Sequence, residues 1–382
     1  MSSLPRDGRF ERQEEGLQEG CVTNKTKGFT LKKLPMLRDP IQRSPMQWAG
    51  QETAPRLASH VDPKLVRLSL TDRCDLACVY CRPHRHDGYT DDKLSLSEWA
   101  IVLAGLRDAG IERVRITGGE PLLSASIVPF VRLVSGFGFK DIALTTNATQ
   151  LAALAKELRD AGLHRLTVSL DTLLPDRFAR LTRGGDLGPV LRGIDRALEV
   201  GFRDTKLNTV VVRGENDTEL EDIVRFAWAR SITPRFLEIM KIGEGASLQH
   251  QLVTMREIRE RLSPLLGKDT PLRDAERGPA RYVHAAPHHK TPEGFVARVG
   301  FISGTSDTYC LDCDRLRVSS DGMVRPCLAK NEGVMIARSG SLDAALVVET
   351  IREAWKHKPD GTTFKGCTEE SASEVSIRAI GG

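Results

Sequence analysis

The chain has 382 residues, of which 40% are hydrophobic, so it is long enough for about two or three domains with a proper core. Its net charge is +4 with acidic and basic residues interspersed, which excludes an extended nucleic-acid surface or a membrane-binding face. The longest stretch without a charged residue, 142–155, contains Thr, Asn and Gln, so we expect no transmembrane helix.

Residues 1–60 are polar and contain many prolines, which predicts a poorly ordered extension. The first residues have no apolar core and are rich in acids, unlike a signal peptide, so a cytoplasmic location is expected. In such a protein, clustered cysteines indicate metal ligands rather than disulfides. Cys21 lies within the extension and is expected to be a free thiol.

Three cysteines, Cys74, Cys78 and Cys81, follow the first predicted strand at C-x3-C-x2-C spacing. Three thiolates leave one iron of a [4Fe–4S] cluster without a protein ligand, whereas four would close the site. With Tyr80 before the last cysteine, this run resembles the signature of the radical S-adenosylmethionine (SAM) superfamily. The resemblance implies that the open iron binds SAM and that an electron from the cluster releases the 5'-deoxyadenosyl radical. A zinc knuckle, or three unrelated thiols, is the alternative interpretation.

Strand-like and helix-like segments alternate from residue 64 to about residue 240. The predicted strands cover 64–70, 112–117, 140–145, 164–170, 205–212 and 234–240, and the predicted helices cover 97–109, 124–135, 149–161, 188–201 and 217–230. Six βα units imply parallel strands joined by right-handed crossovers. A partial barrel and a doubly wound sheet both satisfy this pattern.

The faces of the strands favour the barrel, because side chains alternate between the two sides of a strand. One side carries Arg67, Ser69, Arg115, Thr145, Ser169, Lys206, Asn208, Glu238 and Met240, while the other side is apolar and includes Leu237 and Ile239. A polar inner wall suits an open barrel that holds a large anionic ligand near the C-terminal ends of its strands. The alternative is a sheet covered on one side with a few charges at its edge.

The second predicted strand ends in the run Gly118-Gly119-Glu120-Pro121. Paired glycines let the backbone approach a ligand because no Cβ is in the way. One βα unit beyond the cysteines, this run resembles the superfamily element that receives the amino group of SAM.

A second cysteine set follows a less regular section, 241–300. Cys310 and Cys313 form a C-x2-C pair, and an Asp321-Gly322 turn is expected to fold the chain back so that Cys327 joins them. Cys367, 40 residues further on, has no local pairing geometry and is not expected to be a ligand.

Zinc is the alternative metal for this second set, with His284, His288 or His289 as a fourth ligand. Arg315 and Arg317 favour a different role, because two alternating guanidinium groups beside a metal form a clamp for an anion. A purely structural zinc hairpin does not need them.

The two cysteine sets, the Arg-x-Arg run and the terminal Gly381-Gly382 together resemble the GTP 3',8-cyclase family over residues 64–382. The resemblance implies an α/β fold: an incomplete (βα)6 TIM-like barrel over 61–240 and a C-terminal β-rich domain over 241–382 that carries a second iron–sulfur cluster. It also implies conversion of GTP to 3',8-cyclo-7,8-dihydro-GTP, the first step of molybdenum cofactor biosynthesis, with two [4Fe–4S] clusters and SAM.

The resemblance further assigns roles to single residues. It implies that the first cluster is held by Cys74, Cys78 and Cys81 and the second by Cys310, Cys313 and Cys327. The implied contacts of SAM are Tyr80, Gly119, Ser169 and Met240, and those of GTP are Arg67, Arg115, Thr145, Lys206, Arg315, Leu316 and Arg317. The residues implied to take part in catalysis are Arg67, Gly381 and Gly382. Four residues depart from the family pattern, namely Asp75, Arg82, Ala148 and Asp314. Ala148 replaces a glycine, which matters if the backbone there needs a positive φ.

The expected partners are GTP, an external electron donor and a downstream molybdopterin-pathway enzyme, with a homodimer as one candidate assembly and with no nucleic acid or membrane. Two other functions fit parts of the sequence. One is a radical SAM peptide maturase that uses the second cluster as an auxiliary electron carrier. The other is a binding module stabilised by zinc, without enzymatic activity.

Overall fold

The computed structural model describes residues 62–82, 89–90, 92–268, 271–273, 278–306, 309–310, 313–336 and 342–359. All of them belong to one compact unit, Pro45–Gly382. The predicted extension 1–60 with Cys21, the Gly381-Gly382 tail and Cys367 lie outside the described residues. Within the described ranges, no helix is long and apolar enough to cross a membrane.

Parallel strands alternate with helices in the first half of the described chain, as the sequence pattern predicts. The elements are β1 (Leu65–Ser69), α1 (Leu96–Asp108), β2 (Arg113–Thr117), the 3-10 helix η1 (Pro121–Leu123), α2 (Ile127–Gly136), β3 (Asp141–Thr146), α3 (Leu151–Asp160), β4 (Arg165–Ser169), α4 (Pro175–Leu181), α5 (Leu187–Glu199), β5 (Lys206–Val210), α6 (Leu220–Ala229) and β6 (Thr233–Leu237). Every predicted element of this half is confirmed, and its bounds differ by three residues or fewer. The sequence pattern missed two short elements of this half, the 3-10 helix η1 and the helix α4 in the fourth crossover.

Shorter elements make up the second half. They are α7 (Glu244–Ser247), the 3-10 helix η2 (Gln249–Gln251), α8 (Met255–Arg261), β7 (Leu272–Arg273), β8 (Arg281–His284), β9 (Arg298–Ile302), β10 (Arg315–Val318), β11 (Met323–Arg325), β12 (Val334–Met335) and α9 (Ala344–Lys356). The antiparallel pairing of β10 with β11 confirms the predicted hairpin at Asp321-Gly322.

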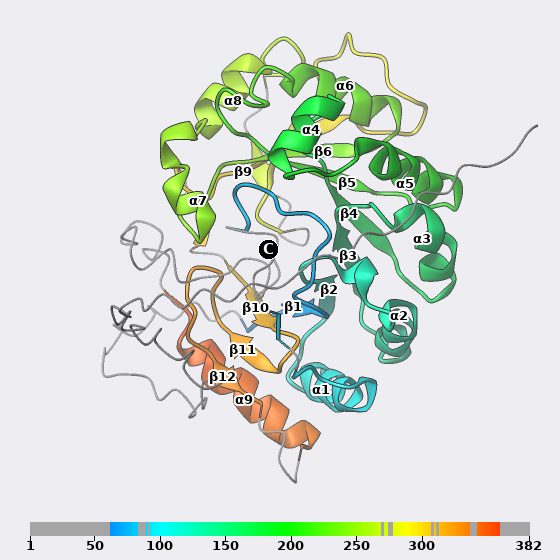
Figure 1. Ribbon diagram of the computed structural model, residues 1–382, viewed down its shortest axis with the longest axis vertical. Helices are drawn as coiled ribbons and strands as arrows, with labels where there is room; N and C mark the ends of the chain where they lie inside the picture. The colour runs from blue at the N-terminus through cyan, green and yellow to red at the C-terminus, as the bar shows by residue number, and fades with distance from the viewer. Residues whose placement is uncertain are drawn as a thin grey trace, which may run out of the picture. The chain divides into compact units, whose positions relative to one another are not determined.

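All these strands belong to one sheet, in the order β12-β11-β10-β1-β2-β3-β4-β5-β6-β9-β8-β7. The C-terminal region therefore adds three strands to each edge of the predicted barrel, because β10 pairs in parallel with β1 and β9 pairs in parallel with β6. Figure 1 shows the strands curving around a central space, with α1 to α6 on the outer side. This arrangement is a partial barrel rather than a doubly wound sheet.

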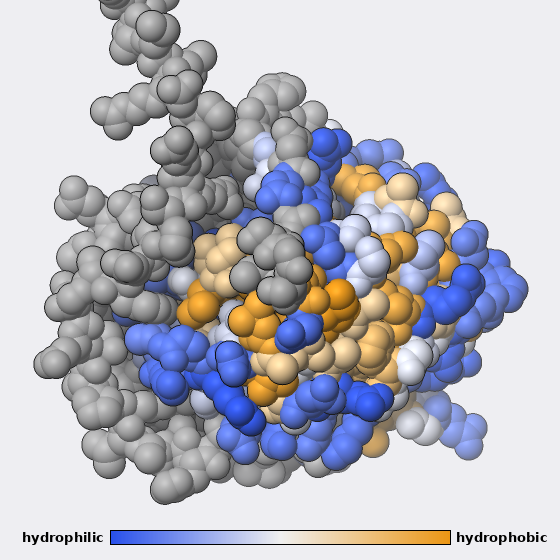
Figure 2. Space-filling model, turned by 90° about the horizontal axis from the view of Figure 1, so that it is seen from below, coloured by the Kyte–Doolittle hydropathy of each residue, from blue (hydrophilic) through white to orange (hydrophobic). Residues whose placement is uncertain are grey.

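The hydrophobic core lies between the outer face of the sheet and the helices. Val66, Leu68, Ile116 and Leu144 are fully buried there, and burial of each such side chain contributes roughly 1.5–3 kcal/mol. The last helix, α9, packs against α1 so closely that a Cβ on Gly105 would lie 2.5 Å from the Cβ of Val347. Figure 2 shows that apolar residues also gather on the face seen from below, among hydrophilic ones.

The predicted faces of β6 were wrong for Leu237, which lies on the inner side, whereas Glu238 and Met240 follow the end of the strand and do line the interior cavity as predicted. Asn208 pairs with Arg235, so Arg235 and Leu237 share the inner face with Asn208, and Phe236 packs outward in the core. The strand ends at Leu237, so its alternation does not extend to Glu238. The carboxylate of Glu238 instead accepts bonds from the backbone of Met255, at 2.6 Å, and from the segment 303–306.

Ala148 has a φ of 64°, a left-handed conformation that costs a residue with a Cβ about 1–2 kcal/mol. Its departure from the family glycine is therefore a source of backbone strain. We expect Ala148→Gly to raise the free energy of unfolding by up to about 1 kcal/mol, measured by denaturant titration. The matched control is Ala155→Gly in α3, which is equally buried and should destabilise the chain instead. Destabilisation by both changes would contradict the strain argument.

Candidate active site

The inner face of the barrel encloses a cavity of about 270 Å³. Its lining includes the predicted residues Arg67, Cys74, Cys78, Tyr80, Cys81, Arg115, Gly119, Thr145, Ser169, Met240, Arg315 and Arg317. Two residues predicted to bind GTP are not in this lining. Leu316 points outward and is fully buried in the hydrophobic core, and Lys206 is buried at the start of β5.

The cysteine loop is fixed by backbone contacts with the Gly118-Gly119 turn. The amides of Gly119 and Glu120 each donate a 2.7 Å bond to a loop carbonyl, those of Thr71 and Arg73. A Cβ on Gly118 would lie 2.2 Å from the Thr71 oxygen, and one on Gly119 would lie 2.3 Å from the Arg73 oxygen. The two glycines are therefore required by the approach of the cysteine loop, in addition to any ligand.

Two of the residues that differ from the family pattern, Arg82 and Asp75, hold this loop in place. The buried Arg82 donates from Nη1 to the carbonyl oxygen of Cys74 at 3.3 Å. Asp75 accepts bonds from Asn147 Nδ2, at 2.8 Å, and from Thr149 Oγ1, at 2.6 Å. Arg82 thus braces the cysteine loop internally, while Asp75 ties it to the chain after β3.

Two buried carboxylates lie beside the loop: Asp171, which the sequence analysis missed, and Glu120, which it named only as part of the Gly-Gly-Glu-Pro run. Asp171 accepts a 2.6 Å bond from the hydroxyl of Tyr80, and burial raises its pKa to about 6. Glu120 accepts bonds from Thr146 Oγ1 and the Asn147 amide, while burial raises its pKa to about 7. Their signal in the sequence is a carboxylate two or three residues after the end of a strand, β4 for Asp171 and β2 for Glu120.

The thiols of the first set suit an iron cluster better than free thiolates. Burial raises the pKa of Cys74 to about 12 and raises that of Cys78 well above its ordinary value. Thiolates at these positions therefore need the positive charge of a metal to balance their desolvation.

The second set converges as predicted. Cys310, Cys313 and Cys327 line one small pocket, which shares Tyr309, Arg315, Arg317 and Leu328 with the barrel cavity. Although burial opposes it, the charges of Arg315 and Lys358 lower the pKa of Cys313 to about 6. The histidines proposed as zinc ligands are not in this pocket, and His289 packs against Trp228 instead.

Three arginines lie side by side on the inner wall between the two cysteine sets. The parallel registers pair Arg317 with Arg67 and Arg67 with Arg115, on adjacent strands β10, β1 and β2. Burial, with repulsion from Arg317 and Arg115, lowers the pKa of Arg67. Burial, with repulsion from other arginines nearby, lowers the pKa values of Arg115 and Arg317 to about 10. We call Arg317, Arg67 and Arg115 the arginine row; buried cations in such a row favour an anionic ligand.

Arg235 and Tyr309 extend this wall, and the sequence analysis missed both. Arg235 lines the cavity and donates from Nε to Asn208 Oδ1 at 2.8 Å, in space left by Gly300. Tyr309 lies beside Arg315, whose Cζ is 4.7 Å from the centre of its ring. Tyr309 directly precedes Cys310, which was its signal in the sequence.

Lys206 provides a test of this electrostatic account. Burial, and then repulsion from Arg235, lower its pKa to about 6, whereas an unfolded lysine has a pKa of about 10.4. Between these values the unfolded chain binds a proton that the folded chain does not, so Lys206 reduces stability progressively as the pH falls.

We therefore expect Lys206→Met to stabilise the ligand-free chain, by an amount that grows as the pH is lowered from about 9 to about 6. Denaturant titrations at several pH values would measure it. The exposed Lys156, which pairs with Asp160, is the matched control, and Lys156→Met should give no pH-dependent gain. A gain that is the same at every pH would contradict the account.

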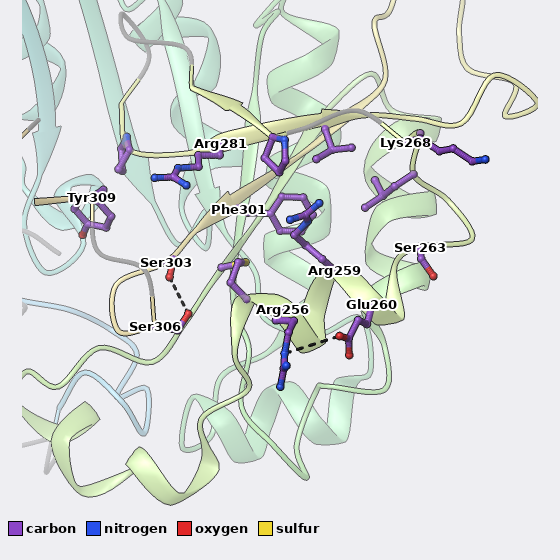
Figure 3. A pocket seen from close by; sticks show the side chains of 16 residues that line it. Arg256, Arg259, Glu260, Ser263, Lys268, Arg281, Phe301, Ser303, Ser306 and Tyr309 are labelled. Atoms are coloured by element: carbon purple, nitrogen blue, oxygen red, sulfur yellow. Dashed lines mark hydrogen bonds and ion pairs between the residues drawn. The ribbon is translucent and has the colours of Figure 1, made fainter.

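A further pocket, of about 690 Å³, lies outside the barrel cavity between α8 and the strands β8 and β9. Figure 3 shows Tyr309 at one end and Lys268 at the other, with the Arg256–Glu260 ion pair on α8. Its lining contains no cysteine. The chemistry of the side chains therefore places the candidate active site in the barrel cavity.

Comparison with known proteins agrees with this chemistry. Residues 68–227 match the radical SAM superfamily, and residues 232–364 match the Molybdenum Cofactor Synthesis C family. The chain is 38% identical over 322 residues to the GTP 3',8-cyclase of Alkaliphilus oremlandii, covering 83% of this chain and 97% of that protein. The chain belongs to the GTP 3',8-cyclase family. A second member, from Heliobacterium modesticaldum, is 40% identical over 308 residues, covering 78% of this chain and 91% of that protein.

Solved structures show the same fold as this member of the GTP 3',8-cyclase family. The crystal structure of Streptococcus suis SuiB aligns with a TM-score of 0.54 at 16% identity, covering 84% of this chain and 73% of that one. The crystal structure of SuiB bound to the precursor peptide SuiA aligns with a TM-score of 0.55. At this identity the likeness concerns the fold alone.

Proposed function

We propose that the chain converts GTP to 3',8-cyclo-7,8-dihydro-GTP, the first step of molybdenum cofactor biosynthesis, with SAM and two [4Fe–4S] clusters. The observation that carries the proposal is the arrangement of one cavity. Its wall holds one three-cysteine set, a second set adjoins it, and the arginine row lies between the two. Membership of the family indicates GTP as the substrate. The buried cations of the arginine row explain how the triphosphate of GTP would be bound.

The two cysteine sets would hold the clusters. Cys74, Cys78 and Cys81 would hold the first and leave one iron open for SAM, and Cys310, Cys313 and Cys327 would hold the second. Tyr80, Gly119, Ser169 and Met240 all line the cavity and are the proposed contacts of SAM. A reduced cluster bound there would supply one electron to SAM, whose cleavage gives methionine and a 5'-deoxyadenosyl radical.

The residues of this chain bind and orient the substrate. Arg67 is the centre of the arginine row and, with Arg115 and Arg317, would neutralise the triphosphate. Because the guanidinium groups are fixed by strand register before GTP arrives, binding needs little rearrangement of charge. A fixed triphosphate holds the ribose and the base in one orientation, which is the main contribution of the protein to ring closure. Thr145, which lines the cavity at β3, is a further proposed GTP contact. Lys206 is also proposed as a contact from the family resemblance, although it is buried at the start of β5 outside the cavity lining.

Other parts of the proposal concern partners and the chain terminus. An external electron donor and a downstream enzyme of molybdopterin synthesis are the proposed partners, and a homodimer is the proposed assembly. The Gly381-Gly382 tail, which lies outside the described residues, is proposed to complete the active site. A peptide-maturase activity is not proposed, because the relatives reported above are GTP 3',8-cyclases.

Transfer of deuterium tests the proposed function. With GTP deuterated at the 3' carbon, we expect 5'-deoxyadenosine to gain one deuterium per turnover, since the radical takes that hydrogen. Unlabelled 5'-deoxyadenosine, formed equally with and without GTP, would contradict the assignment of GTP as substrate. GTP deuterated only at the 2' carbon is the control and should give unlabelled 5'-deoxyadenosine.

A further inference from the structure

A buried lysine, Lys358, follows the last turn of α9 and reaches the second cysteine set. Its side chain is enclosed in the protein, with 6% of the residue exposed. Nζ donates to the carbonyl oxygens of Arg315 and Pro326, both at 2.6 Å, and to Cys313 Sγ at 3.2 Å. An ammonium group has three protons, so these three acceptors match its donors.

The positions of the acceptors link two segments of the second site. Arg315 follows Cys313 by two residues, and Pro326 directly precedes Cys327. One ammonium group therefore ties the segment of Cys313 to that of Cys327, across the β10–β11 hairpin. The spacing of the two sulfur atoms depends on these two segments.

The C-terminal end of α9 does not require a buried lysine with these three acceptors. Lys356, two residues earlier, is also near the end of α9, where it is largely exposed and pairs with Glu353. A lysine at a helix end can interact with the helix dipole from water, whereas burial of an ammonium group costs free energy unless strong acceptors repay it. Lys358 also lies 5.2 Å from the centre of the Trp355 ring, a cation–π contact that helps to hold it.

We propose that Lys358 is a positioning residue for the second [4Fe–4S] cluster. It holds the segments of Cys313 and Cys327 at the separation that the cluster needs, and its N–H bond to the Cys313 sulfur stabilises the reduced form of the cluster. Hydrogen bonds and positive charge at cluster sulfurs favour reduction because the reduced cluster carries more negative charge. This inference rests on the proposed function only in that the second cysteine set holds a cluster.

The test isolates the second cluster in the full-length chain. Cys74, Cys78 and Cys81 are all replaced by alanine, the protein is reconstituted anaerobically, and iron, sulfide and zinc are counted. We expect about four irons per chain. The midpoint potential of this cluster is then measured by a redox titration followed by electron paramagnetic resonance. Zinc in place of iron in this parent would overturn the proposed function before any lysine variant is made.

In this background, we expect Lys358→Met to move the midpoint potential to a more negative value, because the charge and the N–H donor are lost. Lys358→Arg keeps a charged donor and should restore part of the shift. Lys356→Met removes the same charge two residues away and should leave the potential unchanged. If Lys358→Met loses its iron while circular dichroism shows a folded chain, and Lys358→Arg keeps iron, the positioning role is supported.

Two results would overturn the proposal. One is an equal midpoint potential in Lys358→Met and Lys356→Met, which would leave no specific role for the contact with Cys313. The other is unfolding of both Lys358 variants, which would make this lysine a residue of the fold alone. Neither result depends on cyclisation of GTP, so the inference and the proposed function can fail separately.

Discussion

Replacing Cys78 by serine is expected to abolish cleavage of SAM. The residue is the central cysteine of the first set and lines the cavity, and burial already disfavours a charged ligand there. A serine hydroxyl at this position would stay protonated and could not replace the thiolate. The reconstituted variant should lose about four irons per chain and form no 5'-deoxyadenosine above the level of the cluster-free chain, measured by chromatography.

Two controls separate the first cluster from general damage. Cys367→Ser, at a cysteine outside both sets, should keep the full iron content and activity. Cys327→Ser should keep cleavage of SAM but lose the cyclised product, because it removes a ligand of the second set. If Cys78→Ser retained cleavage of SAM with its iron content intact, the assignment of the first cysteine set would be wrong.

Replacing Arg317 by alanine is expected to weaken GTP binding by roughly 10- to 100-fold, the effect of losing a charged hydrogen bond of about 1.5–3 kcal/mol. Arg317 ends the arginine row and is 5% exposed. Cleavage of SAM should continue without cyclisation, since no residue of the first cysteine set is changed. Isothermal titration calorimetry with GTP, together with a count of 5'-deoxyadenosine and product, would measure both effects.

The arginine row also predicts the stability of this variant. Loss of Arg317 relieves repulsion in the ligand-free wall, so the free energy of unfolding should stay the same or rise. Arg256→Ala is the matched control, because Arg256 lies in the pocket of Figure 3 with an exposed side chain and should leave GTP binding unchanged. Equal weakening in both variants would mean that the row is not the triphosphate site.

Much of the barrel could be predicted from the sequence, because each βα unit is long and its apolar residues repeat with a clear period. Prediction failed where the local signal is short. The faces of β6 were misassigned because the predicted strand, 234–240, continued three residues beyond its end at Leu237, so that Glu238 and Met240 were included in the alternation. The pairing of β9 and β10 with the barrel edges joins segments far apart in the chain, which no local pattern records.

Parts of the candidate site could likewise be predicted from the sequence, and other parts could not. Cysteine spacing identified both sets, because ligands close together on one loop carry their own signature. The arginine row depends on strand register, since Arg67, Arg115 and Arg317 belong to three separate segments that only the folded sheet aligns. Arg235 was missed because it lies on the inner face of β6, the strand whose faces were misassigned. Lys358 could not be found, because its three acceptors lie 32 to 45 residues away in the chain.

The most direct test of the central claim is anaerobic incubation of the reconstituted, reduced chain with SAM and GTP. Iron, 5'-deoxyadenosine and cyclised guanosine product would be measured in the same sample. We expect about eight irons per chain, as two [4Fe–4S] clusters require, and a product that forms only when GTP and SAM are both present. Formation of 5'-deoxyadenosine without any product from GTP would contradict the cyclase function and leave radical chemistry on another substrate.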